Sequence, residues 1–265
     1  MPHKPSPPSA PSDPSAEKPM RLAKRMADAG VCSRRKAEEK ILQGLVKVNG
    51  KLVETPAFTV VSTDSVVVEG KLLESQRPAT RMWIFHKPTG CLTTHSDPQG
   101  RATIFDILPR DLPRVITIGR LDYNSEGLLL LTNNGEVARY CSLPQTGWKR
   151  KYRVRAFGAI PHKFKEKVAS GVTIDGIRYG AIGIEIDSTK EESPNHIPNP
   201  RARQNFWFTV TLTEGKNREI RNVFEHFGLA VNRLIRTAYG PFNLDELPRG
   251  KVQEVPPKFI RNYLP

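Results

Sequence analysis

The sequence predicts an α+β fold in two parts, and three observations support this prediction. At Met20 a proline-rich start gives way to two helical patterns and short strands. A polar segment, Ser75–Thr80, then predicts a linker that separates the first part from the rest of the chain. Beyond the linker, alternating or continuously apolar strands are interspersed with amphipathic helices, which is typical of an α+β protein.

The whole chain is strongly basic. It carries 41 lysine and arginine residues against 27 aspartate and glutamate residues, a formal net charge of +14 over 265 residues. Such a chain commonly binds a polyanion, and we expect nucleic acid ahead of a membrane surface. No apolar run approaches the ~18 residues that span a bilayer, and the N-terminus lacks the apolar core of a signal peptide. We therefore expect a cytoplasmic protein that does not bind membranes.

The three cysteines, Cys32, Cys91 and Cys141, are scattered and odd in number. They fit neither a disulfide framework nor the spacing of a zinc site. We expect buried, reduced thiols and no metal site.

Residues 1–19 include seven prolines, with serine and alanine between them. Proline removes a backbone donor and disfavours helix, and almost nothing in this segment could contribute to a core. We expect a disordered tail. Its lack of arginine and its two acidic residues argue against a transit peptide.

Residues 20–75 predict a small α+β module. An apolar stripe indicates a helix that ends at Gly30, and Ser33 is a suitable N-cap for a second helix that runs to Leu42. Two short strands are predicted after the helices: Val46–Val48, which enters an Asn-Gly turn, and Ser65–Val68.

Positive charge is concentrated in this module, with nine basic and three acidic residues between Met20 and Lys51. Three of the basic residues stand at the start of the second helix, where the helix dipole already favours anions: Arg34, Arg35 and Lys36. A solvated basic face is one interpretation, and a surface that contacts nucleic-acid phosphates is the alternative.

After the linker the pattern predicts a longer series of strands and helices, with an irregular, proline-containing surface loop at 188–204. The predicted strands are Met82–Phe85, Val115–Ile118, Leu128–Leu131, Trp148–Arg155, Val172–Gly176 and Asn205–Thr213. The predicted helices are Ile160–Ser170 and a segment with an apolar stripe from Ile220 to Phe227 that Gly228 ends.

Two of these strands flank a short polar segment that contains a carboxylate. The strand Val115–Ile118 alternates, whereas Leu128–Leu131 is continuously apolar, as expected for a strand buried on both faces. Asp122 lies between them, two residues after Arg120. On the pattern alone, Asp122 is either a solvated loop residue or a carboxylate that rigid strands hold at the mouth of a cleft.

The segment around Asp122 resembles the signature of bacterial ribosomal RNA pseudouridine synthases, in the branch that modifies single uridines of small- and large-subunit rRNA. The similar residues are Gly119–Asp122 (GRLD) and Ser125–Asn133 (SEGLLLLTN). The resemblance implies that Asp122 is the catalytic residue and that Arg120 enters the RNA helix near the extruded base. Asn134 stands where the family usually has aspartate, a mild departure because Asn-Gly and Asp-Gly favour the same turns.

The resemblance also implies a fold. Residues 80–255 would form a catalytic domain with a mixed, mostly antiparallel sheet and flanking helices. Residues 20–75 resemble the small alpha-L RNA-binding module named after a small-subunit ribosomal protein, in the stretches Ala29–Glu38 and Gly44–Gly50. Because this module commonly precedes the synthase domain, its basic helix start would bind RNA phosphates.

A second family motif is the Lys-Pro-x-Gly turn at 87–90. Proline fixes the backbone and glycine admits a positive φ, so a structural role for Lys87 is favoured, with direct RNA contact as the alternative. The preceding His86 has no visible partner that would make it a catalytic base.

The stretch Trp148–Arg155 resembles the Lys-x-Tyr motif of the family. Strand alternation places Lys149 and Lys151 on one face, where they would contact RNA, and Tyr152 on the other. On the pattern alone Tyr152 is a core aromatic. The resemblance instead implies an active-site tyrosine that stacks on the target base, worth ~1–3 kcal/mol.

The last motifs surround the helix after Gly215. On spacing alone, Arg221 forms an i, i+4 ion pair with Glu225, whereas the resemblance implies that it pairs with the catalytic aspartate. Lys216 and Arg218 would contact phosphates. On the pattern alone Leu234 is a core residue, whereas the resemblance implies that it is an apolar residue that packs near the target base.

The reaction that the resemblance implies is the isomerisation of uridine to pseudouridine. It requires no cofactor, which agrees with the lack of nucleotide-binding and metal motifs. We expect a monomer that acts on ribosomal RNA or a pre-ribosomal particle, and the flanking residues look more like the large-subunit branch. A non-catalytic ribosome-assembly factor is the alternative. A generic DNA binder has no supporting signature.

Overall fold

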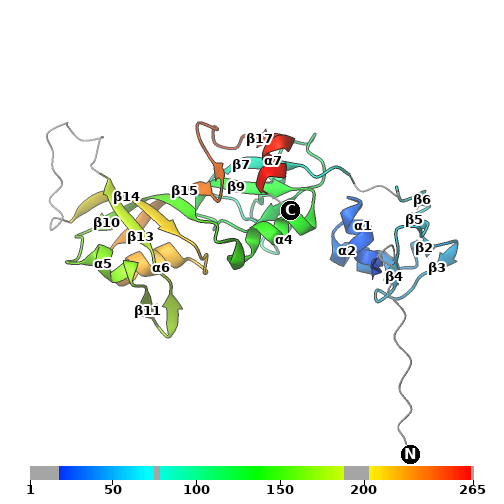
Figure 1. Ribbon diagram of the computed structural model, residues 1–265, viewed down its shortest axis with the longest axis horizontal. Coiled ribbons are helices and arrows are strands. Elements are labelled where there is room, and N and C mark those ends of the chain that lie inside the picture. Colours follow the sequence, from blue (N-terminus) through cyan, green and yellow to red (C-terminus); the bar gives the residue numbers. More distant parts are fainter. Residues whose placement is uncertain (1–17, 75–77, 188–202, 264–265) are drawn as a thin grey trace, which may run out of the picture. The chain divides into compact units, whose positions relative to one another are not determined.

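The computed structural model describes residues 18–74, 78–187 and 203–263 (Figure 1). Most of the predicted tail (1–19) and of the predicted loop (188–204), and half of the predicted linker, lie outside the described residues. The chain divides into two compact units, Met1–Ala79 and Thr80–Pro265. None of the helices within the described ranges has the length and apolar character needed to cross a membrane.

The first unit combines two helices with short strands, as predicted. Its helices are α1 (Leu22–Asp28) and α2 (Arg34–Leu42), and its strands are β1 (Met20–Arg21), β2 (Val46–Val48), β3 (Lys51–Leu52), β4 (Thr59–Val60), β5 (Val66–Val68) and β6 (Lys71–Leu72). Ser33 caps α2 by accepting a hydrogen bond from the backbone N–H of Lys36 at 3.2 Å, and Gly30 follows α1 with φ 81°. Strands β3, β2, β5 and β6 form an antiparallel sheet that packs its valines against the helices.

The second unit is built on a nine-stranded mixed sheet, which confirms the predicted fold class. The order is β13-β14-β10-β15-β9-β7-β17, with β16 on β15 and β8 on β9. Only β9 and β15 are parallel among the strand pairs described for this sheet. The strands are β7 (Met82–Lys87), β8 (Ile116–Ile118), β9 (Glu126–Thr132), β10 (Arg150–Gly158), β13 (Gly183–Asp187), β14 (Gln204–Leu212), β15 (Ala230–Tyr239), β16 (Phe242–Asn243) and β17 (Val252–Glu254); β11 (Val172–Ile174) and β12 (Ile177–Tyr179) form a separate hairpin.

Helices flank this sheet. They are α3 (Ile104–Ile107), α4 (Gly135–Ser142), the 3-10 turn η1 (Pro144–Thr146), α5 (Phe164–Ala169), α6 (Glu219–His226) and α7 (Pro257–Tyr263). Helix α5 is shorter than predicted because Lys163, just before it, adopts a left-handed φ of 55°. The sequence patterns did not predict α4.

Asn134 has a different role from the expected one. It is the N-cap of α4, and its side-chain oxygen accepts hydrogen bonds from the backbone N–H groups of Glu136 (2.9 Å) and Val137 (3.4 Å). The substitution therefore lies at a helix N-cap and not in the Asn-Gly turn by which the sequence explained it. Asparagine and aspartate are interchangeable here because both cap helices well.

Strand β9 is buried at every position, as predicted. Leu128 and Leu130 pack into the core on one face of the sheet, whereas Leu129 and Leu131 pack into the core on the other. Burying four leucines on two faces gives the strand a fixed position. It therefore provides a rigid support for the loop that precedes it.

Candidate active site

The loop between β8 and β9 carries Asp122 and is held by hydrogen bonds to its backbone. Thr93 Oγ1 donates to the carbonyl oxygen of Leu121 at 2.8 Å and accepts from the N–H of the same residue at 3.3 Å. The N–H of Ser125 donates to the carbonyl oxygen of Asp122 at 3.0 Å. These contacts fix the Asp122 backbone, so the direction of its side chain is set by the fold.

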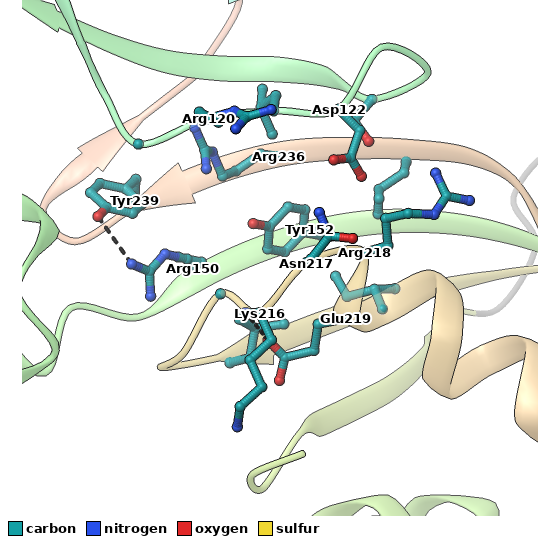
Figure 2. A pocket seen from close by; sticks show the side chains of 17 residues that line it. Arg120, Asp122, Arg150, Tyr152, Lys216, Asn217, Arg218, Glu219, Arg236 and Tyr239 are labelled. Atoms are coloured by element: carbon teal, nitrogen blue, oxygen red, sulfur yellow. Dashed lines mark hydrogen bonds between the residues drawn. The ribbon is translucent and has the colours of Figure 1, made fainter. Parts of the chain in front are cut away.

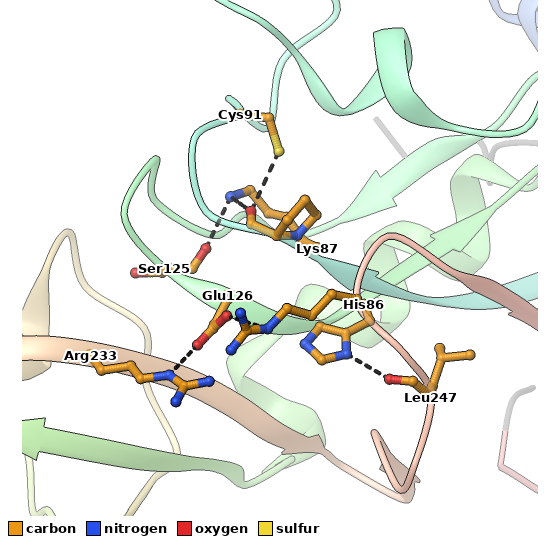
Figure 3. A network of polar contacts seen from close by, with 9 residues as sticks. His86, Lys87, Cys91, Ser125, Glu126, Arg233 and Leu247 are labelled. Carbon is orange, nitrogen blue, oxygen red and sulfur yellow. Dashed lines mark hydrogen bonds and ion pairs between the residues drawn. The ribbon is translucent and has the colours of Figure 1, made fainter.

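Lys87 supports the same loop from beneath. Its side chain is fully buried, and Nζ donates to the carbonyl oxygens of Pro88 (2.9 Å) and Ser125 (3.0 Å) (Figure 3). It also donates to the carbonyl oxygen of Asp122 at 3.1 Å. Burial lowers the pKa of the Lys87 amine. Direct contact of Lys87 with RNA, the alternative considered from the sequence, is wrong, because an ammonium enclosed by three carbonyl oxygens cannot reach a phosphate. The structural role that the sequence favoured is the one observed.

Glu126, the first residue of β9, anchors the opposite side of the loop. Its buried carboxylate forms ion pairs with Arg233 (2.6 Å) and Arg249 (3.1 Å) (Figure 3). Nearby, His86 Nδ1 donates to the carbonyl oxygen of Leu247 at 2.6 Å. This network ties β9 to β15 and to the segment before β17, and sequence reasoning missed it because its members are far apart in the chain.

Asp122 opens into a cavity of about 400 Å³ (Figure 2). The cavity walls come from the 119–125 loop, from β10 and β15, and from the 215–220 segment that leads into α6. Six residues selected from the sequence line it together: Arg120, Asp122, Tyr152, Lys216, Arg218 and Leu234. Their convergence from four segments makes this cavity the candidate active site.

Tyr152 and Leu234 were each considered either a core residue or a residue beside the target base, and the structure shows both features of the two side chains: they are in the core and they line the cavity. Both are buried, at 8% and 6% exposed, and belong to the main core, yet both line the cavity. Lys151 is exposed on the other face of β10, as the alternation predicted, and Lys149 is exposed just before the strand. Neither lysine is among the residues that line the cavity, so contact of these lysines with RNA would occur outside it.

Arg221 contacts the loop that carries Asp122, but not in the expected way. Its guanidinium donates from Nη2 to the carbonyl oxygen of Asn124 (2.8 Å) and from Nη1 to that of Val231 (2.9 Å). Within the described ranges it forms an ion pair neither with Asp122 nor with Glu225. Burial lowers the pKa of Arg221, and the nearby charge of Asp122 opposes that shift. The predicted ion pair is thus replaced by backbone contacts.

The cavity also contains a buried carboxyl group that sequence reasoning missed. Glu219 accepts a hydrogen bond from the backbone N–H of Lys216 at 2.9 Å. Burial, with the adjacent Glu214, raises the pKa of Glu219 to about 7. Glu214 in turn forms an ion pair with Lys216 Nζ at 2.5 Å, so these three residues hold the cavity wall before α6 together.

A second missed feature is the arginine-rich end of the cavity. Arg150 and Arg236 lie over the same Tyr239 ring, with their guanidinium carbons 4.8 and 5.2 Å from its centroid. Arg150 also donates to the Tyr239 hydroxyl at 3.1 Å, and that hydroxyl donates to the carbonyl oxygen of Cys141 at 2.8 Å. No pattern in the sequence indicated that β15 would carry a buried arginine.

The basic residues of α2 lie in the other unit. Arg34, Arg35 and Lys36 are exposed at its first turn. The three cysteines are buried, and none of them forms a disulfide bond. Across the parts of the chain that the structure describes, no three His, Cys, Asp or Glu side chains come close enough to hold a metal ion.

Comparison with known proteins agrees with these features. The RNA pseudouridylate synthase family matches residues 81–226, and the S4 domain matches residues 20–66. An uncharacterized RNA pseudouridine synthase of Rickettsia felis is 47% identical over 91% of this chain and 98% of its own length. The ribosomal large subunit pseudouridine synthase B of Yersinia pestis is 39% identical over 92% of this chain and 74% of its own length.

Among solved structures, a pseudouridylate synthase superposes with a TM-score of 0.62 at 23% identity, covering 92% of this chain and all of the other. At this identity the likeness shows a shared fold. Together with the matched family and the relatives, it leads to one conclusion: the chain belongs to the RNA pseudouridylate synthase family, whose members isomerise uridine in RNA, and it carries an S4 domain before the synthase domain.

Proposed function

We propose that this enzyme converts a uridine of large-subunit ribosomal RNA to pseudouridine, with Asp122 as the catalytic residue. The observation that carries the proposal is that Asp122 and Tyr152 line one cavity. The choice of the large subunit rests on the relative of that name in Yersinia pestis. The same kinship favours an enzyme over the alternative of a non-catalytic ribosome-assembly factor.

The reaction detaches the uracil from its ribose, turns it and rejoins it through carbon 5. Asp122 provides the carboxylate, either as a nucleophile on the sugar or the base or as the base that removes a sugar proton. Among the described residues, none donates a hydrogen bond to its side chain, so both oxygens are open to a substrate. The other carboxyl group of the cavity, Glu219, is occupied by the backbone of Lys216.

The target base must leave the RNA stack before Asp122 can reach its nucleotide. A cavity of about 400 Å³ is in the range that holds small ligands, which suits one flipped nucleotide. Tyr152 stacks on the flipped uracil, and Leu234 packs beside it. Arg120, which is exposed at the rim, enters the space that the base leaves in the RNA.

Affinity for RNA comes from phosphate contacts at two places. In the S4 domain these are Arg34, Arg35 and Lys36 at the start of α2; around the synthase cavity they are Lys149, Lys151, Lys216 and Arg218. The enzyme acts as a cytoplasmic monomer on ribosomal RNA or on a pre-ribosomal particle.

The test is to map pseudouridine on ribosomal RNA from cells that lack the protein and from the same cells supplied with wild type, Asp122→Asn or Asp111→Asn. Asp111 is an exposed residue outside the cavity and serves as the matched control. We expect one large-subunit site to lose pseudouridine, and wild type and Asp111→Asn alone to restore it. Persistence of every pseudouridine in all strains would exclude the enzymatic function.

A further inference from the structure

We infer that Arg236 is a further catalytic residue, whose guanidinium binds a carbonyl oxygen of the flipped uracil and stabilises the negative charge on the uracil while it is detached. This inference rests on the proposed function and deepens it. It arises from a residue that no sequence motif selected.

Arg236 is an unusual cation. It is only 3% exposed, and its Nε donates to the carbonyl oxygen of Leu128 at 2.7 Å. Its Nη2 is buried and has no hydrogen-bond partner among the described residues, and none of their carboxylates forms an ion pair with it. A buried charge without a counter-ion is unfavourable, because the charge has lost its hydration. Such a cost is offset when a ligand brings negative charge to the site.

Its position is set by the sheet. Arg236 stands opposite Tyr152 in the pairing of β10 with β15, so the two side chains are neighbours on one face. Behind it, Gly127 approaches so closely that a Cβ there would lie 2.3 Å from the Arg236 carbonyl oxygen. This contact fixes the backbone of Arg236. Figure 2 shows Arg236 among the cavity-lining side chains, on the Arg120 side of Tyr152.

The isomerisation creates the charge that this cation would bind. When the bond between C1′ and N1 breaks, its electron pair leaves with the uracil and spreads over N1, O2 and O4. An electron pair of the base then forms the bond from C5 to C1′, after which C5 loses its proton and N1 gains one. Atoms and charge balance without a co-reactant. The guanidinium of an arginine remains protonated throughout the reaction. A buried hydrogen-bond donor that points at a developing charge stabilises that charge more than water does.

A backbone phosphate is the competing ligand for Arg236, and the geometry favours the base. Phosphates stay on the outside of a flipped nucleotide, where Arg120, Lys216 and Arg218 are exposed. Arg236 is enclosed beside the tyrosine on which the base would stack. The uracil ring is therefore the part of the substrate that comes closest to it.

The test compares RNA that carries uridine at the target position with RNA that carries 5-fluorouridine, whose electron-withdrawing fluorine makes the base a more stable leaving anion. Single-turnover loss of the target nucleoside is measured for wild type, Arg236→Gln, Arg236→Lys and Arg155→Gln. Arg155 is the matched control, on the opposite face of β10 from Tyr152.

For Arg236→Gln we expect the rate on uridine to fall about 100-fold or more. The rate on 5-fluorouridine falls less, so the ratio of the two rates rises at least about 10-fold over wild type. Arg236→Lys, which retains the charge without the planar fork, gives a smaller rise, and it is the variant to use if the glutamine variant does not fold. Arg155→Gln leaves the ratio unchanged.

Two results would overturn the inference. One is an equal loss of rate on both substrates, which a structural role would produce. The other is a loss confined to RNA affinity, which a phosphate contact would produce. The wild-type measurement distinguishes failure of the proposed function from failure of this inference. A wild type that forms no pseudouridine contradicts the proposed function. An active wild type, with the same ratio of 5-fluorouridine rate to uridine rate in the Arg236 variants, contradicts the role of Arg236 alone.

Discussion

The guanidinium of Arg221 in α6 donates a 2.8 Å hydrogen bond to the carbonyl oxygen of Asn124, two residues beyond Asp122. Through this contact a helix from late in the chain holds the loop that carries the candidate carboxylate. Lys87 holds the same loop from β7 through the carbonyl oxygens of Asp122 and Ser125. The position of Asp122 thus depends on two cations that both bind backbone, and neither forms an ion pair with its carboxylate in the described structure.

Replacing Arg221 should impair turnover more than RNA binding. Arg221→Lys keeps the charge but cannot bridge the carbonyl oxygens of Asn124 and Val231, so the loop gains freedom. We expect single-turnover pseudouridine formation to slow about 10- to 100-fold, because small misplacements of catalytic groups are costly. Glu225→Ala is the control, since the alternative ion pair between these residues is not formed. Equal effects of the two variants would contradict this role of Arg221.

Replacing Lys87 should destabilise the synthase domain. Lys87→Met removes the buried ammonium that donates to the carbonyl oxygens of Pro88, Asp122 and Ser125, and we expect a loss of about 2–4 kcal/mol in the free energy of unfolding. Urea denaturation followed by tryptophan fluorescence measures this. Lys251→Met, at an exposed position, should change stability by less than about 0.5 kcal/mol. A Lys87→Met variant that is as stable as wild type but binds RNA more weakly would contradict the structural role and would indicate that Lys87 contacts a phosphate.

Stability should depend on pH through Glu219. Its pKa in the folded chain is raised to about 7, so folding favours the protonated form, and this contribution is complete below the ordinary glutamate pKa and lost as pH rises through about 7. Glu219→Gln removes the dependence. Relative to wild type, the variant should therefore gain about 1–3 kcal/mol between pH 5 and pH 8. Parallel stability curves for the two proteins across this range would show that Glu219 does not titrate there.

The start of α2 should contribute to RNA affinity through phosphates. For Arg34→Ala combined with Arg35→Ala, we expect weaker binding and a salt dependence whose logarithmic slope falls by up to about 2, since each phosphate contact contributes nearly one unit. Binding of ribosomal RNA fragments measured from 50 to 200 mM salt provides the slope. An unchanged slope would mean that these exposed arginines are solvated and do not contact RNA.

The sequence predicted those features that are encoded locally. Continuous apolar residues in β9 indicated a strand buried on both faces, alternation placed Tyr152 and Lys151 on opposite faces of β10, and Ser33 marked the start of α2. Each of these features depends only on the periodicity of side chains along one helix or strand, or on one N-cap residue of a helix.

The remaining features depend on contacts between distant segments. Nothing near Lys87 in the chain indicates that its amine meets the carbonyl oxygen of Asp122, and nothing near Glu126 indicates Arg233, 107 residues away. Arg236 falls in a strand whose alternation is compatible with an exposed arginine. Only the pairing of β15 with β10 and β9 places it inside the cavity.

We propose that the carboxylate of Asp122 carries out the isomerisation in the cavity it shares with Tyr152. The most direct measurement is single-turnover pseudouridine formation in a large-subunit ribosomal RNA fragment by purified wild type and Asp122→Asn, with RNA affinity measured for both. We predict conversion by wild type, none by the variant, and affinities within about threefold of each other. Conversion by Asp122→Asn at the wild-type rate would contradict the claim.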